Sequence, residues 1–167
     1  MKQGSRQSGV TLIELMVSIA VLAIILFIGV PSFQSTLESS RARTITNDFA
    51  SALQLARSEA LKRRVDVSVC ISNQDQDGCD STGDWNDGWL IVTEDGNVIR
   101  IWDAIPVIVN GNGITSTSNE IVFTRTGFSK DSDEHLITID VVNHVRCMNI
   151  NRIGQLSVSI KGAGACS

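Results

Sequence analysis

An uninterrupted apolar run near the start of the chain limits its fold more than any other feature. Residues 10–30 contain Glu14 as their only charged residue. As an α-helix, this run would extend about 30 Å, which matches the hydrocarbon core of a bilayer. It is too long for the apolar region of a signal peptide, and no A-x-A cleavage site follows it. We therefore expect a retained membrane anchor.

The charges around the run predict its orientation. Lys2 and Arg6 precede it, which favours a cytoplasmic N-terminus and places the rest of the chain in the periplasm or outside the cell. Glu14 needs a separate reason, because a charge at the bilayer centre costs about 2.5–3.5 kcal/mol on insertion scales. An ionisable residue inside a membrane span therefore predicts a function and a partner.

Gly9, Glu14 and Pro31 together form a specific pattern. Gly9 separates the basic leader from the run, Glu14 lies five residues further on, and Pro31 follows the run. This resembles the class III leader of type IV pilins and of type II secretion pseudopilins. The resemblance implies that prepilin peptidase cuts after Gly9 and methylates the new N-terminus at Val10, where the family generally has phenylalanine. Residues 1–9 are then a leader peptide.

Cleavage suggests a partner for Glu14. The new ammonium group at Val10 would attract a carboxylate strongly in a low dielectric. We interpret Glu14 as a residue that sets the axial register between staggered subunits; the alternative is that it reaches the membrane surface without a specific partner. Pro31, close to Gly29, is expected to kink or loosen the helix. The alternative is an ordinary membrane-helix proline.

Beyond Pro31 the sequence predicts that the helix continues to residue 64. No glycine or further proline occurs in residues 32–64. Apolar residues recur there every three or four positions, which indicates one buried face: Ile45, Phe49, Ala52, Leu53, Ala56 and Ala60. Lys62, Arg63 and Arg64 are assigned to the last turn, where cations suit the helix dipole.

Residues 65–167 are expected to form one β-rich periplasmic domain. The period changes to two over residues 65–71, which predicts a half-buried strand. Further strands are predicted at residues 89–94, 98–103, 121–124, 136–142, 145–150 and 156–160, separated by turn signals such as residues 110–113. A long helix followed by closely spaced strands predicts an α+β fold with antiparallel sheets.

Composition and the polar residues argue against several functions. The chain has 14 basic and 18 acidic side chains, so its charge gives no general reason to expect nucleic-acid binding. We find no nucleophile–base–orienter set, and therefore expect no enzyme and no cofactor. Residues 75–80 lack the full ligand series of a calcium loop, which favours a solvated acidic loop. His135 and His144 do not have metal-ligand spacing with the cysteines, so no zinc site is expected.

Four cysteines in an oxidising compartment indicate two disulfides. Sequence alone does not prove their connectivity. Pairing Cys70 with Cys79 and Cys147 with Cys166 is favoured, because each pair closes a short loop. The second pair would tie the C-terminal tail to a core strand, a feature that resembles FimT/FimU minor pilins more than GspH proteins.

Two segments narrow the family. Residues 53–70, LQLARSEALKRRVDVSVC, and 84–96, DWNDGWLIVTEDG, resemble the GspH/FimT branch of pilin-like proteins. Within them, Trp85 and Trp89 are expected to pack a sheet edge; the alternative, which is not favoured, is stacking on a carbohydrate. The resemblance implies a minor pilin that helps to initiate and assemble a type IV pilus. Its partners would be prepilin peptidase, other minor pilins, the major pilin and the inner-membrane assembly platform. The alternative is a GspH pseudopilin of type II secretion.

A third hypothesis is DNA binding, because some FimT proteins bind DNA through a Gly-Arg-x-Arg motif. The corresponding residues 154–157 are Gly-Gln-Leu-Ser, so both arginines are missing. Arg146, Arg152 and Lys161 are the remaining candidates for phosphate contacts. DNA is therefore a possible partner that the sequence does not favour.

Overall fold

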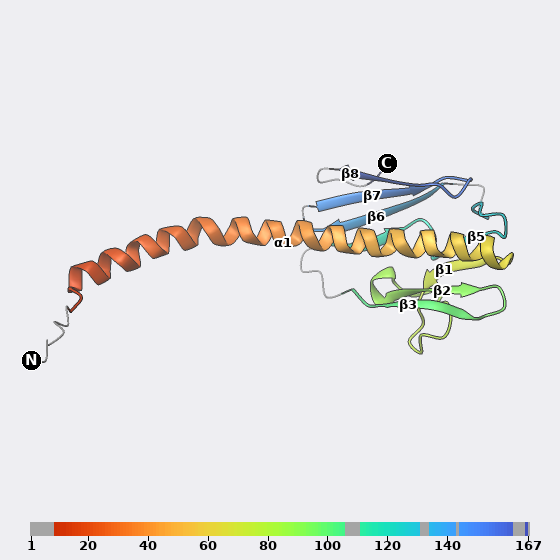
Figure 1. The fold of residues 1–167 in the computed structure, drawn as a ribbon, viewed down its shortest axis with the longest axis horizontal. Helices are drawn as coiled ribbons and strands as arrows, with labels where there is room; N and C mark the ends of the chain where they lie inside the picture. The colour runs from red at the N-terminus through yellow and green to blue at the C-terminus, as the bar shows by residue number, and fades with distance from the viewer. Residues whose placement is uncertain (1–8, 106–110, 131–133, 143, 162–165, 167) are drawn as a thin grey trace, which may run out of the picture. The chain divides into compact units, whose positions relative to one another are not determined.

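The computed structural model describes residues 9–105, 111–130, 134–142, 144–161 and 166, and it divides into two compact units. The first unit comprises residues 1–37 and the second residues 38–167. Helix α1 spans Leu12–Arg63, so it forms the described part of the first unit and the start of the second (Figure 1). α1 is continuous in the structure through Pro31. Bending or melting at Pro31 stays a prediction.

The second unit is α+β, as expected. It contains one short 3₁₀ helix, η1 (Trp85–Asp87). Its described strands are β1 (Val67–Ile71), β2 (Gly88–Thr93), β3 (Val98–Asp103), β4 (Gly113–Ser116), β5 (Glu120–Phe123), β6 (His135–Val141), β7 (His144–Ile150) and β8 (Leu156–Lys161). They form two four-stranded sheets in the orders β3-β2-β1-β5 and β4-β6-β7-β8, and all pairs are antiparallel.

The buried face of α1 packs against both sheets. The predicted helix positions are buried, except that Ile45 is only partly buried, and Ala42 and Thr46 belong to the same face. Along β6, buried core residues alternate with less buried ones. Along β1, Val67, Val69 and Ile71 belong to the core that faces α1, but Cys70 on the other face is also buried. The helix-facing core therefore follows the two periods that the sequence showed.

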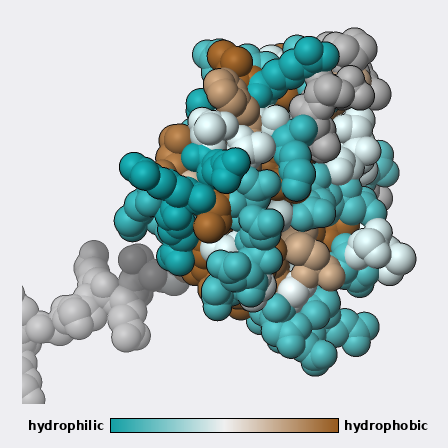
Figure 2. All heavy atoms as spheres, turned by 90° about the vertical axis from the view of Figure 1, so that its right-hand side faces the viewer, coloured by the Kyte–Doolittle hydropathy of each residue, from teal (hydrophilic) through white to brown (hydrophobic). Residues whose placement is uncertain are grey.

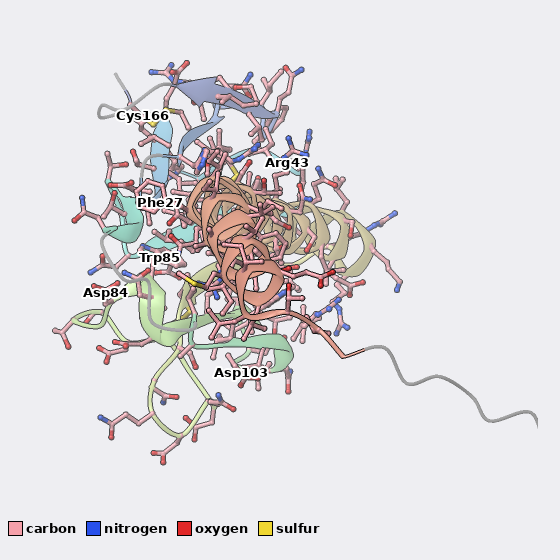
Figure 3. The ribbon with its side chains drawn as sticks, turned by 90° about the vertical axis from the view of Figure 1, so that its left-hand side faces the viewer. Phe27, Arg43, Asp84, Trp85, Asp103 and Cys166 are labelled. Atoms are coloured by element: carbon pink, nitrogen blue, oxygen red, sulfur yellow. A yellow bond between two sulfur atoms is a disulfide. The ribbon has the colours of Figure 1, made fainter. Side chains whose placement is uncertain are left out.

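Three predicted details are wrong. Trp85 and Trp89 do not pack a sheet edge: both are buried and contact Phe49 of α1 edge-to-face, with ring centroids 5.2 and 5.3 Å away. β2 is an inner strand of its sheet, so an aromatic side chain on its inner face meets the helix. Figure 3 shows Trp85 beside α1.

The second is strand β4, which was not predicted and which begins at Gly113, the last position of the expected turn at residues 110–113; residue 110 lies outside the described residues. The short Gly-Ile-Thr-Ser strand contains only one large apolar residue, which is too few to show alternation. The third is Arg64, which follows the helix with φ 60°. Its N–H donates to the Ala60 carbonyl over 2.9 Å, which is the geometry of a left-handed helix cap.

Candidate assembly site

The predicted processing site lies directly before α1. Gly9 and Val10 precede the helix and are exposed, and α1 begins at Leu12. An added Cβ at Gly9 would meet no atom within 4 Å, so this glycine is not required for packing within the chain. The rest of the leader, including Lys2 and Arg6, lies outside the described residues.

Glu14 occupies the third position of the first helical turn. The Thr11 hydroxyl accepts a hydrogen bond from the Glu14 N–H over 3.3 Å, and Ser18 donates its hydroxyl to the Glu14 carbonyl over 2.7 Å. Thr11 therefore caps the helix, and the T-x-x-E spacing is that of a capping box. A carboxylate here also suits the helix dipole. This second role was not recognised in the sequence, although Thr11 and Glu14 show the pattern.

The first unit is apolar around its whole circumference. Its large apolar side chains between Val10 and Leu37 are 43–85% exposed. Among the described residues, α1 is the one helix long and apolar enough to cross a membrane. A helix that is hydrophobic all round needs lipid or partner helices, which fits an anchor that can also assemble.

Two disulfides lie on the faces of the sheets that point away from α1. They join Cys70 to Cys79 and Cys147 to Cys166, which is the favoured connectivity. Cys70 is the register partner of Leu90, and neither belongs to the helix-facing core. Cys147 alternates with the core residue Met148, so it too points away from α1. Each bond therefore ties a residue outside the named strands to a central strand.

The acidic loop satisfies its polar groups locally. The Asp80 carboxylate accepts hydrogen bonds from the Thr82 N–H and hydroxyl, both over 2.8 Å, and these bonds lower the pKa of Asp80. The Asn73 side chain donates to the Asp77 carboxylate over 2.6 Å and accepts a hydrogen bond from the Asp77 N–H over 3.0 Å. In the described parts of the chain, no group of three or more His, Cys, Asp or Glu side chains could hold a metal ion.

The candidate DNA contacts are not brought together. Arg146 and Lys161 lie at one end of the β7–β8 pair, because Val145 is the register partner of Lys161. Arg152 lies in the turn at the opposite end. The Arg146 side chain is also half-buried, and its register partner on β6 is the core residue Ile139. These three cations therefore do not form one continuous patch.

Arg57 holds both sheets to the helix, which the sequence analysis did not predict. Its Nε donates to the Gly127 carbonyl and its Nη2 to the Ile153 carbonyl, each over 2.9 Å. Gly127 lies in the turn after β5, and Ile153 lies in the turn between β7 and β8. Gly154 permits this arrangement: it has φ 70°, and an added Cβ would collide with the Gly127 carbonyl. Nothing in the sequence distinguishes Arg57 from the other basic residues between 32 and 64.

The fold and the N-terminal site together define a class: a pilin-type subunit with an apolar helical anchor and a β-rich head. Comparisons with known proteins identify the family. The family model "Type II transport protein GspH" matches residues 46–154, and the prokaryotic N-terminal methylation motif matches residues 4–30. The chain belongs to the GspH family of type IV pilin-like proteins.

One solved structure shows the same fold. The chain is similar to the type IV minor pilin FimU of Pseudomonas aeruginosa PAO1, with 21% sequence identity and a TM-score of 0.52, over 75% of this chain and 90% of that one. A second crystal form of FimU matches with 22% identity and a TM-score of 0.49, over 72% of this chain and 90% of that one. No curated protein sequence matches the chain.

Proposed function

We propose that this chain is a minor pilin that helps to initiate and assemble a type IV pilus, within a complex at the filament tip. The observation that carries the proposal is the N-terminal arrangement: an exposed Gly9–Val10 junction, directly before an apolar helix with Glu14 in its first turn. The disulfide from Cys147 to Cys166 supports a FimT/FimU-like subunit, because it ties the tail to β7. The role is structural and not catalytic.

In this proposal, prepilin peptidase cleaves after Gly9 at the cytoplasmic face of the inner membrane. The ammonium group of Val10 in one subunit then pairs with Glu14 of a neighbour that is offset along the helix axis. Because a charge without a partner is costly inside a membrane, this pairing favours one offset over others. The periplasmic unit contacts other minor pilins and the major pilin, and the assembly platform acts on the membrane helix.

The test separates pairing from helix capping. Glu14→Gln keeps the size of the side chain but removes its charge, whereas Thr11→Val removes the capping hydroxyl and leaves the carboxylate. We expect Glu14→Gln to be cleaved and to remain in the membrane, yet to fail in filament assembly. Thr11→Val should assemble. Piliation, cleavage and membrane level are measured together, and full piliation of Glu14→Gln would contradict the pairing.

Cleavage itself is tested at Gly9. Because no atom of the chain lies near an added Cβ there, a bulky residue would not disturb the fold and should act only on the peptidase. Gly9→Phe should leave full-length precursor in the membrane, as seen by mass spectrometry. Mature protein of normal mass from this variant would refute the leader assignment.

The second candidate is a minor pseudopilin of type II secretion, which the match to the GspH family model favours. Both machines would use the same anchor and the same register pair. Deletion of the gene distinguishes them, because loss of piliation supports the pilus and loss of protein secretion with normal pili supports the pseudopilin.

A DNA-binding role is the third proposal, and the separation of Arg146 from Arg152 counts against it. The detergent-solubilised protein should bind duplex DNA weakly near physiological salt, because few phosphates are neutralised at once. Submicromolar binding that weakens in Arg146→Ala, Arg152→Ala or Lys161→Ala variants would favour DNA uptake over filament assembly.

A further inference from the structure

A cavity of about 240 Å³ opens between α1 and the turn that joins β7 to β8, within the second unit. Figure 1 shows the end of β7 and the start of β8 toward the C-terminal end of α1. The apolar walls of the cavity come from the helix and three strands: Leu53, Phe123, Ile150 and Leu156. The first three of these side chains are at most 1% exposed, so the cavity reaches down to the core.

The polar side of the cavity carries a positive charge without a counter-charge. Arg57 lines it together with the exposed residues Gln54 and Gln155. Arg57 donates to the carbonyls of Gly127 and Ile153, and both acceptors are neutral. Arg57 takes no part in the ion pairs of the described residues. None of the positions three or four residues away from it on α1 is acidic.

The guanidinium group of Arg57 is held in place and still has donors to offer. It has five N–H donors, and the bonds to Gly127 and Ile153 use two of them. The side-chain oxygen of Gln155 accepts from Asn151 over 3.4 Å, which leaves the amide nitrogen of Gln155 able to donate. Fixed donors beside an apolar wall suit a carboxylate that is attached to a short hydrocarbon group.

The volume of the cavity limits the size of the ligand. An engineered apolar cavity of about 150 Å³ in another protein holds benzene, which has six non-hydrogen atoms. The same space per atom gives about ten non-hydrogen atoms here. Pockets for drug-sized molecules measure about 300–1,000 Å³, so this cavity is too small for a nucleotide. It matches a carboxylic acid with one ring or one short chain.

We propose that this cavity binds a small apolar carboxylate, with the carboxylate on Arg57 and the hydrocarbon part against Phe123 and Leu156. The apolar walls favour such a ligand over inorganic phosphate, which has no hydrocarbon surface to bury. Two sources carry this chemistry: a free organic acid, and the C-terminal residue of a polypeptide that ends in an apolar side chain. The site is additional to the assembly role and does not depend on it.

Phenylacetate is the probe, because it carries one carboxylate and its size matches the cavity. Full-length protein in phosphatidylcholine nanodiscs is titrated with it, and saturation-transfer NMR compares binding with empty nanodiscs. We expect a Kd of about 1 mM, as ligand efficiency allows for so small a molecule. Phenylacetamide has the same shape without the charge and should bind about tenfold more weakly. No binding of phenylacetate, or equal binding of the amide, would overturn the proposal.

Charge substitutions at Gln54 locate the bound carboxylate. Gln54 is exposed, so these changes should leave the fold intact, whereas Arg57→Met would also remove the two hydrogen bonds to the sheets. Gln54→Glu places a competing carboxylate one turn from Arg57 and should weaken phenylacetate binding about fivefold. Gln54→Lys adds a second cation and should strengthen it about threefold. The same response to both variants would refute the site.

Thr44→Glu is the matched control for Gln54→Glu. Thr44 is exposed on α1 and lies about 15 Å from Gln54 along the helix axis. The variant therefore adds the same charge to the same helix without approaching the cavity, and its Kd for phenylacetate should equal that of the wild type. Equal weakening in Thr44→Glu and Gln54→Glu would mean that net charge, and not the cavity, controls binding, and would refute the site.

A peptide distinguishes the two sources of the ligand. N-acetyl-glycyl-glycyl-phenylalanine presents the same ring beside a terminal carboxylate. Binding at least as tight as that of phenylacetate would support the site and assign it to a chain terminus, whereas its exclusion while phenylacetate binds would support a free organic acid. Binding is measured on the isolated protein, so its failure would leave the assembly proposal standing, and full piliation of Glu14→Gln would leave the cavity proposal standing.

Discussion

Arg57 offers the sharpest stability test, because one side chain joins the helix to both sheets. Arg57→Met keeps the length and the helix propensity but removes the two hydrogen bonds to Gly127 and Ile153. Hydrogen bonds from a charged donor contribute about 1.5–3 kcal/mol each. Arg57 is half-buried and Ile153 is 53% exposed. In the variant, hydrogen bonds from water to the two carbonyls therefore recover part of this energy. We expect a loss of about 2–4 kcal/mol in the free energy of unfolding.

The assay is urea unfolding of the full-length protein in detergent. The fluorescence of Trp85 and Trp89 reports on the second unit, because both are buried against Phe49. In thermal unfolding followed by the same fluorescence, the midpoint temperature of Arg57→Met should lie about 10 °C below that of the wild type. Arg57→Lys retains one donor group, so its loss in the free energy of unfolding should be about half that of Arg57→Met.

Arg41→Met is the matched control, because it removes an exposed cation from the same helix. Its free energy of unfolding should equal that of the wild type within about 0.5 kcal/mol. The face of the molecule at which α1 ends is largely hydrophilic, with smaller apolar patches (Figure 2). An unchanged midpoint in Arg57→Met would refute the role of Arg57 in joining the sheets.

Three further predictions concern other contacts of the second unit. The double variant Cys147→Ser/Cys166→Ser should destabilise the second unit by about 3 kcal/mol, because the disulfide closes a loop with a sequence separation of 19. Thermal unfolding measures this loss, and an unchanged midpoint temperature would mean that the bond does not stabilise the fold. Val142 has φ 57°, which is unfavourable for a β-branched residue. Val142→Gly should therefore stabilise the second unit by about 0.5–1 kcal/mol in urea unfolding. Destabilisation would show that the packing of the valine side chain outweighs the backbone strain. The hydrogen bond from Arg63 lowers the pKa of Glu59, so the Glu59 carboxylate stabilises the fold above its unfolded pKa and loses this effect as the pH falls through the folded pKa. Glu59→Gln should therefore flatten the decline of the unfolding midpoint in acid, and an unchanged slope would contradict that link.

The local patterns of the sequence were sufficient for the elements. The apolar run, the three- and four-residue spacing around Phe49 and the alternation in residues 65–71 each reflect burial of one face. The α+β class and most strands followed from these periods. The short β4 strand did not, because one apolar residue, Ile114, shows no period.

The candidate assembly site near the N-terminus is a local pattern that the sequence itself displays. Gly9, Glu14 and Pro31 are close in the chain, so their spacing is visible without a fold. The disulfide pairs were favoured for the same reason, because each closes a short loop. Local sequence separation is the physical basis of both inferences.

Only the tertiary structure decided which distant residues meet. Arg57 reaches carbonyls that are 70 and 96 positions away, and Trp89 lies on an inner strand against Phe49 and not on a sheet edge. Long-range register determines such contacts, and register depends on all strands packing together, so no single stretch of sequence encodes them.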